Sequence, residues 1–120
     1  MPSRRTALAL ISAAHATPAL AHHGWRWTAD GTFERTGRIT AARLGSPHGV
    51  LTVRVNREDW TVEVGQPWRN DHAGLTPAKM AEGTEIHVRG RRHADPAQRI
   101  VKAEVLVIGG VEHILYPDRV

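Results

Sequence analysis

The residues of this chain best suited to chemistry are its histidines. There are 8 of them among 120 residues, and there is no cysteine. Histidine is the commonest side-chain ligand of protein-bound metals. Without thiols, the chain cannot form disulfides, thiolate zinc sites or iron–sulfur clusters, and it cannot perform thiol catalysis. Any metal bound by this chain would therefore be held by nitrogen and oxygen atoms.

Two of the histidines, His22 and His23, directly follow a pattern typical of a secretory signal. A basic start with two arginines precedes a short apolar run at 7–14, and residues 19–21 read Ala-Leu-Ala, a cleavage motif. The apolar run is too short to cross a bilayer, which needs about 20 apolar residues. We expect cleavage after Ala21 and a periplasmic or secreted protein, exported by the general secretory route rather than the twin-arginine route.

Cleavage at that position would make His22 the first residue of the mature chain. Its α-amine, with a pKa near ~8, and its imidazole could then bind one metal ion together. His23 brings a second imidazole to the same ion, and His48, in a tight turn after Pro47, is the expected further ligand. A nitrogen-rich set suits Cu(II), which stands highest in the divalent affinity order. The sequence thus predicts a site for copper or another transition metal at His22, His23 and His48.

The same residues also allow an interpretation in which no metal is bound. The N-terminal pair could be an arm with no ligand, and the histidine of the turn could serve only to cap it. The remaining histidines have simpler interpretations. His87 falls on the outward face of a predicted strand, His72 and His93 fall in predicted polar loops, and no role is predicted for His113.

The elements that must position these residues are mostly strands. Alternating apolar and polar residues and turn clusters predict strands at 33–44, 50–56, 60–64, 84–91 and 100–108, with a short sixth at 111–116. A polar, irregular connection is expected at 65–74. A short helix should follow, with Thr76 as its N-cap and Gly83 just past its end.

Three strands, a short helix and two further strands are the element order of the OB fold. The sequence predicts an all-β fold, a small five- to six-stranded OB-like antiparallel barrel with one short helix between strands 3 and 4. A generic β-sandwich or roll is the alternative. The expected parts are a signal at 1–21, an N-terminal arm at 22–32 pinned by Trp25 and Trp27, and the barrel at 33–120.

Short motifs along the chain also occur in a characteristic order. They are Ala21-His22-His23-Gly24 after the signal, Pro47-His48 in the first turn, Trp60-Thr61-Val62-Glu63 in the third strand, Gly65-Gln66-Pro67 in the next loop, and Leu75 with the segment from Gly83 to Gly90. In this order they resemble a family of small exported bacterial proteins known as domain of unknown function 6152. Ser46 and Thr84 depart from the usual Asn and Asp of that pattern. The resemblance implies export and a small barrel, and it carries no assigned activity.

The sequence lacks the motifs of common catalytic sites, and this favours a binding function over catalysis. There is no nucleophile elbow, no glycine-rich phosphate loop and no recognisable nucleophile–base set, so we expect no enzyme. Nucleic-acid binding, common among OB barrels, needs exposed aromatic residues. Here Trp60 is expected in the core, and the chain has one Phe and one Tyr. We therefore expect no nucleic-acid partner, and no membrane span once the signal is cleaved.

The alternative function is a cell-envelope protein-interaction module without metal or catalysis. In that case Trp25, Trp27 or Trp68 would form the contact patch, because tryptophan is a frequent anchor of protein interfaces. The sequence does not predict the oligomeric state.

Overall fold

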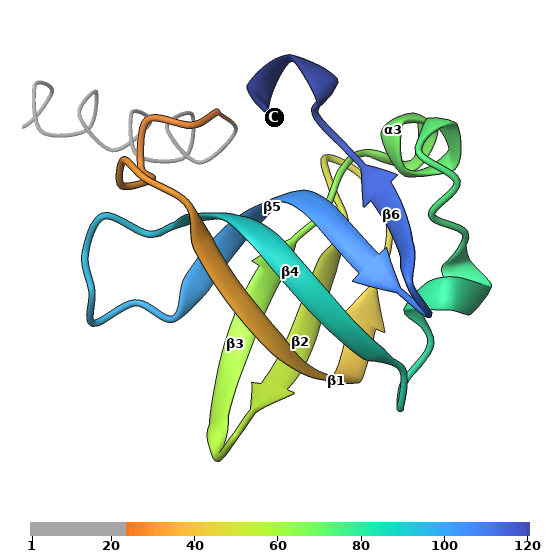
Figure 1. Cartoon of the computed structure of the whole chain (residues 1–120), viewed down its shortest axis with the longest axis horizontal. Coiled ribbons are helices and arrows are strands. Elements are labelled where there is room, and N and C mark those ends of the chain that lie inside the picture. The colour runs from red at the N-terminus through yellow and green to blue at the C-terminus, as the bar shows by residue number, and fades with distance from the viewer. Residues whose placement is uncertain (1–23) are drawn as a thin grey trace, which may run out of the picture.

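A single six-stranded sheet closes on itself in the computed structural model, which describes residues 24–120 (Figure 1). The strands are β1 (Phe33–Arg43), β2 (Val50–Val55), β3 (Glu58–Glu63), β4 (Glu85–Arg92), β5 (Ile100–Ile108) and β6 (Val111–Ile114). Their order in the sheet is β3-β2-β1-β4-β5-β6, and β3 also pairs with β5. The predicted signal, His22 and His23 lie outside the described residues.

The barrel is formed by β1 to β5, and β6 adds an outer strand to β5. Its closing pair, β3 with β5, is parallel, whereas the other pairs are antiparallel. A closed ring of five strands cannot alternate direction all the way round, so one pair must be parallel. The predicted OB-like barrel is therefore confirmed, with the refinement that its sheet is mixed.

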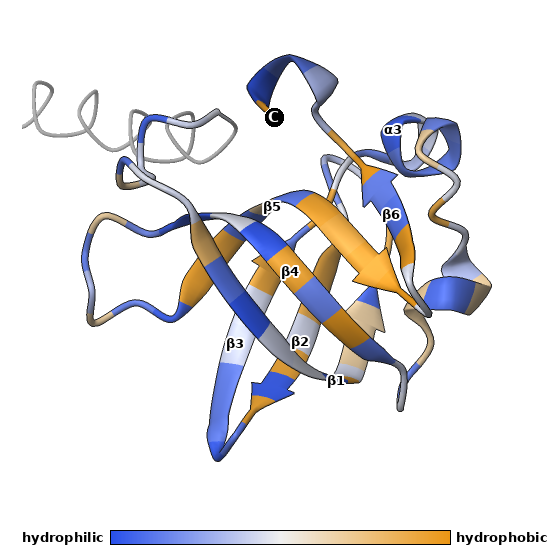
Figure 2. Ribbon diagram, in the orientation of Figure 1, coloured by the Kyte–Doolittle hydropathy of each residue, from blue (hydrophilic) through white to orange (hydrophobic). Residues whose placement is uncertain are grey.

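The core follows the alternation of the sequence on β2, β3 and β4. Leu51, Val53 and Val62 are fully buried, and Trp60 is 5% exposed. Figure 2 shows the matching alternation of hydrophobic and hydrophilic residues along β4. On β1 the expected parity fails after Ile39, because a bulge shifts the register between Ile39 and Ala41 and leaves Ala41 exposed.

The connection between β3 and β4 contains helix α3 (Pro67–His72) and the 3-10 helix η1 (Pro77–Met80). The prediction of an irregular segment at 65–74 was wrong, because Pro67 begins a helix there at the position where its missing N–H costs nothing. The helix predicted after Thr76 is only one 3-10 turn, since the chain is already extended at Ala81. Both elements lie between the third and fourth strands, as predicted.

The arm before β1 packs onto the barrel. Trp27 is 8% exposed, its carbonyl accepts a hydrogen bond from the Ala94 N–H at 2.9 Å, and Thr28 bridges to His93. The chain ends in the 3-10 helix η2 (Pro117–Arg119). Among residues 24–120, no helix has the length and apolar character needed to span a membrane.

Candidate functional site

A pocket of about 210 Å³ lies at the end of the barrel where β3 ends. We call it the His48 pocket. It gathers residues from the arm, the β1–β2 turn, the α3 region, β5 and the C-terminal segment. Its lining residues are Gly24, Trp25, Pro47, His48, Gln66, Arg69, Lys102 and Tyr116. Segments far apart in the sequence therefore meet at one polar, partly aromatic site.

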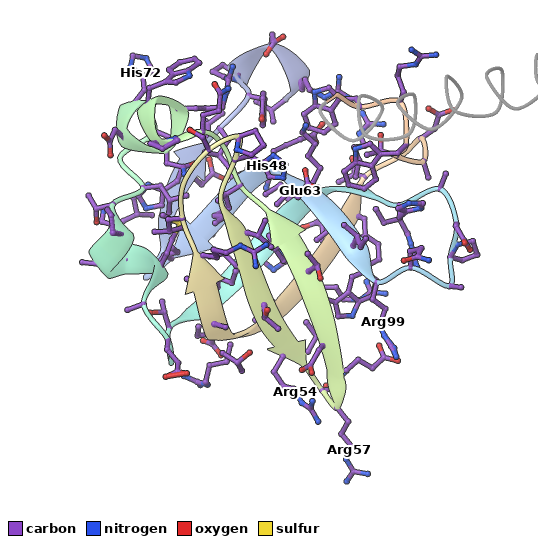
Figure 3. The ribbon with its side chains drawn as sticks, turned by 180° about the vertical axis from the view of Figure 1, so that it is seen from behind. His48, Arg54, Arg57, Glu63, His72 and Arg99 are labelled. Carbon is purple, nitrogen blue, oxygen red and sulfur yellow. The ribbon has the colours of Figure 1, made fainter. Side chains whose placement is uncertain are left out.

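His48, which lines this pocket, lies beside the carboxylate of Glu63, which does not itself line it. Its Nε2 is 3.4 Å from Oε1 of Glu63, and the two side chains are 22% and 12% exposed. Figure 3 shows both at the same end of the barrel. Oε1 of Glu63 is buried and accepts no hydrogen bond from the residues that the structure describes. A nitrogen and an oxygen donor thus lie side by side at this end of the barrel.

The turn that carries His48 is held against the end of β3 by its backbone. The Gly49 N–H donates to the Gly65 carbonyl, and the Val64 N–H donates to the Gly49 carbonyl, both at 2.9 Å. The period-two alternation of residues 60–64 predicts Glu63 on the outward, solvated face of its strand together with Thr61. That prediction missed the site, because the β1–β2 turn folds over the end of β3 and covers the last residue of the strand.

Helix α3 is fastened to the same end of the barrel by a buried amide. Asn70 is 5% exposed; its Oδ1 accepts from the Gly65 N–H at 2.8 Å, and its Nδ2 donates to the Gly65 carbonyl at 2.9 Å. This clamp positions Gln66 and Arg69 at the pocket. Nothing in the local sequence pattern distinguishes Asn70 from an exposed helix residue.

Lys102 forms the floor of the site. The parallel pairing of β3 and β5 sets it beside Glu63, and the residue is only 6% exposed. Its Nζ donates to the Gly24 carbonyl at 3.2 Å and lies 4.8 Å from the ring centroid of Trp25. Burial lowers the pKa of the Lys102 amine, the Glu63 carboxylate opposes this, and nearby arginines add to the lowering.

The amine of Lys102 should therefore titrate below the usual lysine value of about 10.4. The chain has two lysines, so Lys79→Arg leaves Lys102 as the only one, and its ¹³Cε chemical shift can be followed against pH. The unfolded chain holds this proton more tightly than the folded chain. The free energy of unfolding should therefore rise with pH between the folded pKa and the unfolded value of 10.5. A midpoint at or above the usual value would contradict the burial argument.

Two aromatic residues, Trp25 and Tyr116, form an aromatic wall of the pocket, and arginine side chains pack against both rings. The rings of Trp25 and Tyr116 meet edge to face with centroids 5.0 Å apart. The Arg119 guanidinium lies 3.7 Å from the Trp25 centroid, and the Arg69 guanidinium lies 4.2 Å from the Tyr116 centroid. Burial raises the pKa of the Tyr116 phenol, although Arg69 opposes this. The wall is preorganised, because each ring is fixed on more than one side.

The buried carboxylate of Glu104 holds Arg119, the arginine that packs against Trp25 in this aromatic wall. Its Oε2 accepts from the Nε of Arg119 at 3.0 Å and lies 3.4 Å from the Nε of Arg91. Because Glu104 is 3% exposed, this pairing is screened little by solvent. Arg119 is thereby held over the ring of Trp25, near the start of the described part of the N-terminal arm.

Two of the other histidines, His87 and His93, have structural partners. His87 lies 2.7 Å from Glu34 and also 2.7 Å from the hydroxyl of Thr36, and the His93 ring accepts from the Asp95 N–H rather than pairing with its carboxylate. His72 is exposed on α3 rather than in a loop.

His113, for which the sequence predicted no role, is 2% exposed. Its Nδ1 donates to the Ala73 carbonyl at 2.9 Å, just past the end of α3. It therefore joins β6 to the helix.

The predicted ligands are thus placed in part. His48 lies in the pocket, and Gly24, the residue after His23, lines the same pocket. Within residues 24–120, no three His, Asp or Glu side chains form a group that could hold a metal ion. His48 and Glu63 supply two donors, and a complete ligand set would need groups from outside the described residues.

Comparison with known proteins shows the fold and nothing further. No protein-family model matches the chain, and no curated protein matches it. Among solved structures, similarity is found to a complex of TiaS with a transfer RNA, AMPCPP and agmatine, with a TM-score of 0.50 and 11% identity over 64% of this chain. A ZRD-deleted mutant of TiaS in complex with agmatine gives a TM-score of 0.49 and 13% identity. The chain spans only about a fifth of the length of these structures, 21% of the mutant and 18% of the complex.

Proposed function

We propose that this chain is an exported binding protein that holds Cu(II), or another transition-metal ion, at the His48 pocket. The observation that carries the proposal is the 3.4 Å separation between Nε2 of His48 and Oε1 of Glu63. Two donors that each lie about 2.1 Å from one ion are about 3.4 Å apart at the tetrahedral angle that Zn(II) adopts, and about 3.0 Å apart at the right angle that Cu(II) prefers. The spacing therefore suits a shared ion as well as a direct ion pair.

The N-terminal arm supports the proposal because it leads into the same pocket. Gly24 lines the pocket and is bonded through its carbonyl to Lys102. The Cα of His22 is two residues away and so lies within about 7 Å of the Gly24 Cα. The α-amine and imidazole of His22, with the imidazole of His23, are thus the proposed completing ligands.

The pocket carries positive charge that a bound cation must overcome, because Arg69 and Lys102 line it and Arg119 lies beside Trp25. Lys102 would repel a metal ion, but burial lowers its pKa and so reduces the cost of losing its proton. Glu63 contributes a negative charge beside it. The carboxylate is therefore a proposed ligand in addition to the three histidines that the sequence predicted.

The test compares the chain beginning at His22 with the same chain carrying three added residues, Ala-Ala-Ser. A single added residue is unsuitable, because a histidine at position three forms its own square-planar Cu(II) site with the amine and backbone amides. We expect one Cu(II) per mature chain, nitrogen couplings in its electron paramagnetic resonance spectrum, and binding at least about tenfold weaker in the extended form. Equal affinity of the two forms would exclude the amine as a ligand. Mass spectrometry of periplasmic protein would show whether the chain starts at His22.

A protein-interaction role is the second candidate, and one observation favours it. Trp68 on α3 is 58% exposed, and the Arg69 guanidinium lies 4.6 Å from its ring centroid. Trp25 and Trp27 are engaged with the barrel, so of the three predicted anchors Trp68 is the one left accessible. This candidate requires a partner whose binding is unchanged by copper.

A further inference from the structure

A second hollow, of about 360 Å³, lies at the opposite end of β3 from the His48 pocket. It is lined by three arginines, Arg35, Arg92 and Arg99, together with Trp60, Glu58 and the loop at 96–97. We call it the arginine hollow. Figure 3 shows Arg99 and the hairpin residue Arg57 well away from His48. The hollow is therefore separate from the proposed metal site.

Two buried donors of the hollow have no acceptor. Within residues 24–120, neither Nε1 of Trp60 nor Nε of Arg92 donates a hydrogen bond, although both atoms are buried. Trp60 as a whole is 5% exposed. Buried N–H groups are almost always paired, because leaving one unpaired sacrifices its hydration without replacement. Both donors therefore call for an acceptor that the described residues do not supply.

Two of the three arginines, Arg92 and Arg35, are held in place by their contacts. The Arg92 guanidinium lies 5.1 and 5.2 Å from the ring centroids of Phe33 and Trp60, and its Nη2 donates to the Pro96 carbonyl at 3.0 Å. The Arg35 guanidinium lies 4.2 Å from the Phe33 centroid. Little side-chain entropy would be lost on binding a ligand to groups already fixed in this way.

The charge of the hollow is strongly positive. Glu58 is the single carboxylate among its lining residues, against three guanidinium groups. The neighbouring Arg54 is already paired with Asp59 at 2.9 Å, so Asp59 does little to neutralise the hollow. Arg99 is exposed and makes no ion pair with any described residue. Electrostatics therefore favour an anion here.

We propose that the arginine hollow binds a tetrahedral oxyanion, the phosphate or sulfate group of a small molecule or polymer. The planar guanidinium fork matches the oxygens of such groups, and its charge-assisted hydrogen bonds are stronger than neutral ones. The guanidinium groups of Arg35, Arg92 and Arg99 would supply the donors, and the ring of Trp60 lines the same hollow. This proposal does not depend on metal binding at the His48 pocket.

The indole N–H of Trp60 gives a direct test. Its signal in a ¹H–¹⁵N spectrum, assigned by its loss in Trp60→Phe, would be followed during separate titrations with inorganic phosphate, sulfate and chloride at matched ionic strength. We expect saturable movement with phosphate or sulfate and none with chloride. The oxyanion that saturates at lower concentration identifies the source group. An unmoved signal, or equal movement with chloride, would overturn the proposal.

A charge-matched pair of variants separates a built site from general attraction. Arg99→Gln should weaken oxyanion binding roughly tenfold, because one charge-assisted contact is lost. Arg43→Gln removes the same charge from an exposed position at the end of β1 and should leave affinity unchanged. Equal weakening by both variants would show that the protein's overall charge, and not the hollow, attracts the anion.

Discussion

Replacing His48 with alanine should weaken Cu(II) binding by the mature chain about 100-fold. The substitution removes a proposed imidazole ligand whose Nε2 lies 3.4 Å from the Glu63 carboxylate. Nothing else in the described part of the pocket offers an imidazole. A loss of this size corresponds to about 2.8 kcal/mol of binding free energy. Isothermal titration calorimetry with a competing chelator would measure it.

The matched control is His72→Ala, because His72 is exposed on α3 and does not line the pocket. It should leave copper affinity unchanged. Glu63→Gln should give an intermediate loss of roughly tenfold, since a neutral amide oxygen is a weaker ligand than a carboxylate. If His48→Ala and His72→Ala bind copper equally well, then His48 is only an ion-pair partner of Glu63 and the proposed ligand set is wrong.

Gly90→Ala should lower the free energy of unfolding by about 3 kcal/mol, the upper part of the range for overpacked interiors. Gly90 lies on β4 where the register with β5 shifts. A Cβ built there would lie 2.0 Å from the Lys102 carbonyl oxygen, which is backbone and cannot rotate away. Strand β5 would have to move, and Lys102 would move with it. Urea unfolding monitored by circular dichroism would report the loss.

Gly24→Ala is the control for this experiment. A Cβ at Gly24 would have no neighbour within 4 Å, so the stability of the protein should change by less than about 0.5 kcal/mol. A loss below about 1 kcal/mol for Gly90→Ala would mean that the two strands can separate cheaply. The tight β4–β5 contact would then not be what fixes Lys102 beneath the pocket.

Most of the barrel was predictable because strand patterns are local. On β2 and β3, alternate residues enter the core, as the period of two requires, and the predicted inward faces are the buried ones. The failures occurred where neighbours in space override that period. The bulge on β1 reversed the expected face of Ala41, and α3 formed where a polar sequence predicted an irregular loop.

Of the described residues of the candidate site, His48 is the one that the sequence predicted. His48 was identified because it follows Pro47 in a turn, which is a local feature. Glu63 was misassigned to solvent, because the strand pattern cannot show that a turn folds over its end. Lys102 carried no signal at all, since its neighbour Glu63 is set by the pairing of β3 with β5. The arginine hollow was missed for the same reason.

The sequence by itself determined the strands, the inward faces of β2 and β3, the element order of the barrel and the histidine-rich character of the chain, because these depend on neighbouring residues and on composition. The tertiary structure alone decided which side chains meet. Closure of the barrel brings β5 beside β3, and with it Lys102 beside Glu63 and the Gly24 carbonyl. It also places Trp60, whose buried indole N–H has no acceptor among the described residues, in a hollow lined by three arginines. Such contacts join residues far apart in the chain, so their energies depend on packing that no local pattern contains.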